Sequence, residues 1–269
     1  MVTRLIADIA DPVIRRLLML AEETLGPAPV PYLWLACGSQ GRQEKTGVSD
    51  QGNCLILNDA VTDADHDGYF AQMAKIVCDG LDACGYVYCP GDMMATNPMW
   101  CQPLVKWRGY VNGWVNKPVP EAQMLASVMF DLRPIGGHIG LFDDLQDQTL
   151  TMAYKNSLFV AHMVSNSLKH TLPLGLLRGF ATIRSGEHKN PLDRKHIGVV
   201  PVVDRGRVYA LQAPFEQGEH PRSAGGRDPR RCAAEIRRST RCRSAPMPSR
   251  LTCAWWIPCS WAVGPHQAS

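Results

Sequence analysis

Residues 38–57 read GSQGRQEKTGVSDQGNCLIL, and they follow the apolar run Tyr32–Cys37. A Gly-Ser pair that closes an apolar strand leaves backbone N–H groups and a hydroxyl available to a phosphate, because glycine permits close backbone approach. The next apolar run, Cys54–Leu57, begins soon after the acidic residue Asp50. The pattern predicts two strands joined by a segment that holds phosphate.

Several further blocks appear in order along the chain: CPGDMMATNPMW at 89–100, FDLRPIGG at 130–137, PLG at 173–175, LDRK at 192–195 and RVYAL at 207–211. Together with residues 38–57 they resemble bacterial nucleotidyltransferases of the DNA polymerase β superfamily. The resemblance is to the branch related to protein-PII uridylyltransferase, which carries a nucleotidyltransferase substrate-binding C-terminal domain. Members of this branch are often fused to CBS or cyclic-nucleotide-binding domains. The resemblance covers about residues 5–212.

The resemblance implies a site for a nucleoside triphosphate and a divalent cation, Mg²⁺ or Mn²⁺. Gly38, Ser39 and Gly41 would hold the phosphates in the loop, and Arg42 would bind them as a charged clamp. Asp50 would be the first metal-binding carboxylate. The implied reaction is transfer of UMP or AMP to a protein or small-molecule acceptor, in a signalling context.

Position 52 departs from the family pattern, because relatives carry a second aspartate where this chain has Gly52. Glycine offers no metal ligand. Gln51 and Asn53 do not replace the missing carboxylate, since neighbouring strand residues point to opposite faces. Loss of one shared metal ligand predicts a rate lower by orders of magnitude if both metals are needed.

A third carboxylate in this family comes from a later strand. We expect Asp92, which follows the predicted strand Tyr86–Cys89, to be the nearer candidate for this catalytic role. Asp131 favours a structural interpretation, as a salt bridge to Arg133.

Hydrophobic spacing predicts an α+β fold in which a small mixed-sheet nucleotidyltransferase domain, 1–138, precedes an all-helical substrate-binding-type domain, 139–212. The first domain combines helices at 10–25 and 63–83 with the three strands, and we expect its helices on one side of the sheet. Residues 100–120 predict a helix-poor connection in which Trp100, Trp107 and Trp114 pack between the domains. Helices are expected from 121, with a break at 134–137, and then at 141–170 and 175–184.

Composition excludes some functions. Residues 213–269 contain nine arginines against four acidic residues, so the net charge of +3 leaves the remainder slightly negative. We therefore expect no nucleic-acid partner. No apolar run reaches membrane-spanning length and no secretion signal is evident, which predicts a cytoplasmic protein without membrane contact. The ten cysteines lack regular spacing, and Cys37, Cys54 and Cys78 are expected to be reduced, buried thiols.

Residues 213–269 form an irregular tail rich in Arg, Pro, Cys and Trp, without an apolar period. We interpret it as translated out of the original reading frame, and a genuine basic disordered tail is the alternative. Three hypotheses for function follow. The chain is an active nucleotidyltransferase, a catalytically inactive module that binds nucleotide or a regulatory partner protein, or a damaged gene product.

Overall fold

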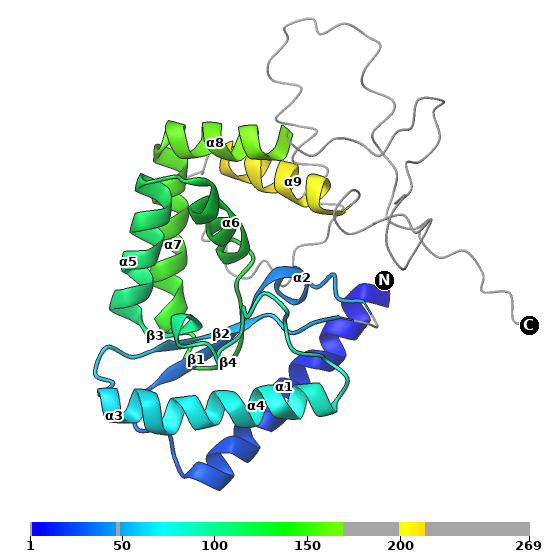
Figure 1. Cartoon of the computed structure of the whole chain (residues 1–269), viewed down its shortest axis with the longest axis vertical. Helices are drawn as coiled ribbons and strands as arrows, with labels where there is room; N and C mark the ends of the chain where they lie inside the picture. The colour runs from blue at the N-terminus through cyan, green and yellow to red at the C-terminus, as the bar shows by residue number, and fades with distance from the viewer. Residues whose placement is uncertain (1, 47–48, 169–198, 213–269) are drawn as a thin grey trace, which may run out of the picture. The chain divides into compact units, whose positions relative to one another are not determined.

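The structure is a computed structural model that describes residues 2–46, 49–168 and 199–212. The chain divides into two units, Met1–Phe215 and Glu216–Ser269, and the described residues belong to the first. The predicted α+β class is confirmed, because a four-stranded mixed sheet lies among helices (Figure 1). The tail at 213–269 and the helix expected at 175–184 lie outside the described residues, and the domain boundary near residue 138 stays a prediction.

The sheet has the strand order β3-β2-β1-β4. Strand β1 (Tyr32–Ala36) is antiparallel to both of its neighbours, β2 (Asn53–Leu57) and β4 (Arg133–Gly137), while β2 is parallel to β3 (Cys101–Pro103). The segment 134–137, expected to be a break between helices, is therefore a strand. Pairing with β1 brings the Asp-Leu-Arg block to the end of β1 where the Gly-Ser turn begins.

The two helices expected in the first domain, at 10–25 and 63–83, lie on one face of the sheet as predicted, and further helices cover the other face (Figure 1). The helices α1 (Val2–Leu25) and α4 (Ala71–Ala83) pack on one face, and α5 (Leu104–Asn116) and α7 (Gly140–Lys155) pack on the other. All five residues of β1 are buried. A strand that is buried on both faces reads as a continuous apolar run, which explains why β1 and β2 lack an alternating pattern.

The helix predicted over 63–83 is present in three consecutive pieces, α3 (Asp63–Asp65), a π-helical turn η1 (His66–Phe70) and α4. The strand predicted at Tyr86–Cys89 is absent, and β3 pairs with β2 instead. The side-chain amide of Gln51 donates to the carbonyl of Tyr86 at 2.9 Å, and the chain then turns at Pro90. A side chain thus takes a carbonyl that a strand ladder would use, and proline cannot donate to a ladder.

The expectation of a helix-poor connection at 100–120 is also wrong, because α5 spans thirteen of these residues after the short 3-10 helix η2 (Pro98–Trp100). Gly109 and Gly113 lower the helix propensity of this segment. Burial of Trp107, Val111 and Trp114 along one helix face outweighs that cost. The indole N–H of Trp107 also donates to the Leu55 carbonyl at 3.0 Å, so these tryptophans are core residues that fix α5 to β2.

The long helix expected at 141–170 is divided at Asn156 into α7 and α8 (Ser157–Leu168). The Asn156 side chain accepts from the Phe159 N–H at 2.9 Å and donates to the Val115 carbonyl at 3.0 Å. It therefore caps the start of α8 and fixes this corner against the end of α5. The helices α6 (Pro120–Met129) and α9 (Val200–Gln212) complete the described elements.

Two expectations about composition can be compared with the described residues. Their six cysteines are free thiols, and Cys37, Cys54 and Cys78 are buried as predicted. No helix within these residues combines the length and apolar character needed to cross a bilayer.

Removal of the Asn156 cap should destabilise the fold. We expect Asn156→Ala to lower the free energy of unfolding by about 1–2 kcal/mol, because two hydrogen bonds at the α7–α8 corner are lost. Denaturant unfolding would measure the change. Asn116→Ala is the matched control, since Asn116 bonds the exposed side chain of Asn112, and it should change stability by less than about 0.5 kcal/mol. Equal effects of the two substitutions would contradict the capping role.

Candidate nucleotide site

The predicted phosphate loop is a single helical turn, α2 (Gly38–Gly41), which begins directly after β1. Gly38 adopts a positive φ of 58°, a conformation that favours glycine, and the turn is closed by hydrogen bonds from Arg42 N to Gly38 O and from Glu44 N to Ser39 O. The first N–H groups of a helical turn have no acceptor within the turn. The backbone of Gly38 and Ser39 is therefore suited to meet an anion.

Gly41 is required by a close approach of two backbone segments. A Cβ atom at this position would lie 1.8 Å from the carbonyl oxygen of Asp131 and 3.1 Å from that of Ala36. Any side chain at position 41 would force α2 away from the segment between α6 and β4. Sequence reasoning placed Gly41 among the phosphate-binding residues, and the structure gives it a packing role.

A buried ion pair fixes α2 to its surroundings. Both Nη atoms of Arg133 donate to the carboxylate of Asp11 in α1, at 2.6 and 2.9 Å. The same guanidinium donates to the backbone carbonyls of Gln40 at 3.1 Å and Gly41 at 3.2 Å. Arg133 therefore joins α1, α2 and β4 in one arrangement. The predicted pairing of Asp131 with Arg133 is wrong, because Asp11 is the partner of Arg133.

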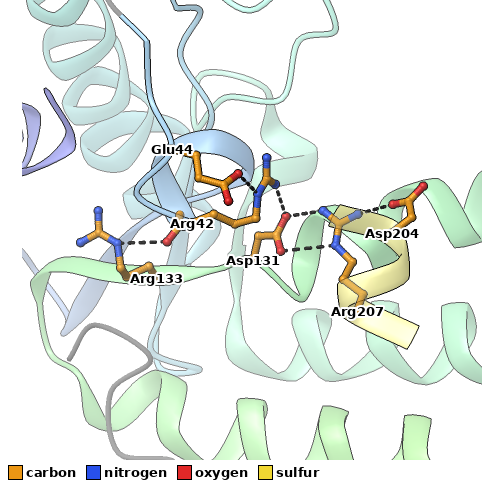
Figure 2. Close-up of polar contacts among 7 residues, drawn as sticks. Arg42, Glu44, Asp131, Arg133, Asp204 and Arg207 are labelled. Carbon is orange, nitrogen blue, oxygen red and sulfur yellow. Dashed lines mark hydrogen bonds and ion pairs between the residues drawn. The ribbon is translucent and has the colours of Figure 1, made fainter. Parts of the chain in front are cut away.

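Arg42 lies at the end of the turn, where it is held by two carboxylates (Figure 2). Its Nε donates to Glu44 at 2.8 Å, and its Nη1 donates to Asp131 at 2.5 Å. Asp131 also accepts from Arg207 of α9, which in turn pairs with Asp204 at 2.6 Å. The predicted phosphate clamp is thus part of a network of five charged side chains.

Asp50 and Gly52 precede β2 and stand beside the end of β1. Cys37 N donates to the Gly52 carbonyl at 3.0 Å, and a Cβ atom at position 52 would lie 3.0 Å from the Cys37 sulfur. The Asn53 side chain donates to that of Gln51. Gln51 also donates to the Cys78 carbonyl in α4, and Asn53 accepts from the Ala95 N–H. They therefore face away from the position that a side chain at 52 would occupy.

Asp92 is exposed, with a positive φ of 53°, and its carboxylate accepts from Asn97 Nδ2 at 3.0 Å. Asp131 is the carboxylate that stands near the candidate site, since its charge, like that of Asp50, acts on the buried Cys37 thiol. Burial, with smaller contributions from neighbouring charges, raises the pKa of Cys37 to about 12. The catalytic role of Asp92 stays a prediction.

Lys45 is a buried cation that sequence reasoning did not single out. It is 2% exposed, its Nζ donates to Gln40 at 3.1 Å, and it lies 4.3 Å from the centre of the Tyr86 ring. Burial lowers the pKa of Lys45 to about 8, against the opposing effect of Asp50 and weaker contributions from Cys37 and Asp11. A lysine within a polar run gives no sequence signal of burial, because lysine is rarely buried.

The donors at this site do not fit a pair of protein-held metal ions. Gly52 contributes no side chain, and within the described ranges no group of three or more His, Cys, Asp or Glu side chains could hold a metal ion. What the arrangement does offer a triphosphate is the N-terminal backbone of α2, the Arg42 guanidinium and the Asp50 carboxylate.

The close approach at Gly41 predicts a large effect of a single methyl group. We expect Gly41→Ala to lower the free energy of unfolding by about 3 kcal/mol, because the Asp131 backbone must move. Gly113→Ala, where a Cβ would meet no atom within 4 Å, should leave stability unchanged or raise it by up to about 1 kcal/mol. Chemical denaturation measures both, and a neutral Gly41→Ala would contradict the packing role.

The depressed pKa of Lys45 predicts a pH-dependent difference between the natural chain and Lys45→Met. Between about pH 8 and the ordinary lysine pKa near 10.5 the unfolded chain binds the proton and the folded chain does not. Stability from this group therefore rises with pH in that window. We expect Lys45→Met to have a higher free energy of unfolding than the natural chain. This difference should be largest near pH 7 and should shrink towards pH 10. Denaturant titrations at both pH values test this, and a constant difference would contradict it.

Comparison with known proteins finds two family models that match parts of this chain. Residues 1–121 match the family model described as "Putative nucleotidyltransferase DUF294". Residues 157–219 match the model described as "Putative nucleotidyltransferase substrate binding domain". A search of curated proteins gave no match. The two matches support the coarser part of the resemblance inferred from the sequence, since residues 1–121 are similar to a putative nucleotidyltransferase and residues 157–219 to a putative nucleotidyltransferase substrate binding domain.

Proposed function

We propose that this chain binds a nucleoside triphosphate at α2 and that Gly52 leaves it with little capacity to transfer the nucleotide. The observation that carries the proposal is the packing at position 52. No side chain is present there, and the Cys37 sulfur stands 3.0 Å from the point where a Cβ would lie. A side chain at position 52 would therefore crowd the Cys37 sulfur, which would have to shift by a few tenths of an ångström.

Triphosphate binding is supported by the groups that remain. The N–H groups of Gly38 and Ser39 and the guanidinium of Arg42 would bind the phosphate oxygens. Asp50 would face a divalent cation, Mg²⁺ or Mn²⁺, carried by the triphosphate. No step of the proposal depends on a metal ion held by the protein alone.

If a carboxylate were present at position 52, the reaction would be transfer of UMP or AMP to a protein or small-molecule acceptor in a signalling pathway. A chain that binds nucleotide without turnover would serve as a regulatory module. A nucleotide would then act as a signal rather than as a substrate.

Restoration of the carboxylate tests the proposal. We expect the natural chain to bind ATP or UTP and to transfer no α-labelled nucleotide above background in the presence of Mg²⁺. Gly52→Asp combined with Cys37→Ala should gain at least about tenfold in label transfer, since the smaller side chain at 37 makes room for the carboxylate. Gly52→Asp alone should gain less.

Gly91→Asp is the matched control, because it adds the same charge at an exposed glycine with ordinary contacts. It should transfer no more label than the natural chain. Strong transfer by the natural chain would overturn the assignment of Gly52 as the limiting position. Absence of nucleotide binding in every variant would overturn the proposed function.

A further inference from the structure

One carboxylate joins two arginines that are far apart in the sequence. Arg42, which follows α2, and Arg207 of α9 both donate to Oδ2 of Asp131, and Arg207 also reaches Oδ1 through its Nε at 3.4 Å (Figure 2). The side chain of Asp131 is 7% exposed, and that of Arg207 is 14% exposed. At this degree of burial, the loss of a partner leaves a charge that water cannot fully solvate.

The two arginines differ in what else they bind. Arg42 extends a second N–H towards Glu44, whose side chain is 45% exposed. Arg207 is held by the mostly buried Asp204, three residues earlier in α9. Arg42 is therefore the more accessible partner of Asp131, with 22% of its side chain exposed, and it lies at the turn proposed to bind phosphate.

A phosphate that turns the Arg42 guanidinium towards itself competes with Asp131 for Nη1. Once Arg42 turns towards the phosphate, Asp131 loses one of its two cations and depends on Arg207 for charge neutralisation. The presence of Arg207 thus lowers the free energy required to release Arg42. The contact between α9 and Asp131 becomes more important when nucleotide is bound.

We propose that Asp131 couples α9 to nucleotide binding, with Arg207 acting as a positioning residue that allows Arg42 to exchange its carboxylate partner for a phosphate. The inference rests on the proposed function, because it assumes that phosphate binds at Arg42. Coupling between two sites is reciprocal, so nucleotide should also strengthen the docking of α9.

The coupling predicts effects of opposite sign at the two ends of one ion pair. Arg207→Ala should weaken ATP binding by about tenfold, because Asp131 would be left unpaired when Arg42 moves. Asp131→Asn should strengthen ATP binding, because Arg42 no longer has a competing carboxylate. In the Asp131→Asn background, Arg207→Ala should have little further effect, since the coupling passes through Asp131.

Isothermal calorimetry with ATP and Mg²⁺ measures these affinities with the cation that the triphosphate carries. Arg205→Ala is the control, because it removes the same charge from the same helix and should change the affinity by less than about twofold. Arg207→Lys should recover part of the affinity. Thermal unfolding of each variant shows whether a loss of binding is a loss of fold.

Amide hydrogen exchange in α9 provides a readout of the reverse effect. Exchange of the α9 amides should slow when ATP is added to the natural chain, and this protection should disappear in Arg207→Ala. Equal ATP affinities of folded Arg207→Ala and the natural chain would overturn the coupling while leaving the proposed function intact. Absence of ATP binding to the natural chain would overturn both.

Discussion

The candidate site depends on the buried ion pair between Asp11 and Arg133. This pair connects the first helix to the last strand of the sheet, and the same guanidinium binds two carbonyls of α2. A one-turn helix cannot maintain its own position, because helix formation is costly at such lengths. Arg133 therefore helps to orient the Gly-Ser turn through the carbonyls of Gln40 and Gly41. Gly41 makes this possible by leaving room for the backbone of residue 131.

The chemistry of the site is limited by what stands beside that turn. In the described residues the neighbourhood of Asp50 contains the buried ammonium of Lys45 and the buried thiol of Cys37. A second carboxylate at position 52 would meet this thiol first. The absence of a side chain at position 52 leaves room for the Cys37 sulfur, so a carboxylate there would require this sulfur to move.

Sequence patterns predicted the elements that are set by local signals. The strand around Trp34, the helix over 63–83 and the turn at Gly38 follow from apolar runs and glycine placement, and all are present. The helix α5 was not predicted, because its two glycines and the nearby prolines indicate a loop although one face of the segment is apolar and buried. The partners of Asp131 were missed because Arg42 and Arg207 lie 89 and 76 residues away from it. Ion pairs at such separations follow from the tertiary fold, which local sequence patterns do not show.

The position of Asp131 in the chain suggests why one carboxylate binds two arginines. The match to the putative nucleotidyltransferase model ends at residue 121 and the match to the substrate binding domain model begins at 157, so Asp131 lies between the two matched regions. Arg42 belongs to the first region and Arg207 to the second. A charge placed in the connecting segment can contact both regions at once, whereas a charge within either region would bind mainly its own neighbours. Because the mostly buried Asp131 is shared in this way, the loss of the arginine from one region leaves its charge to be neutralised by the arginine of the other region alone.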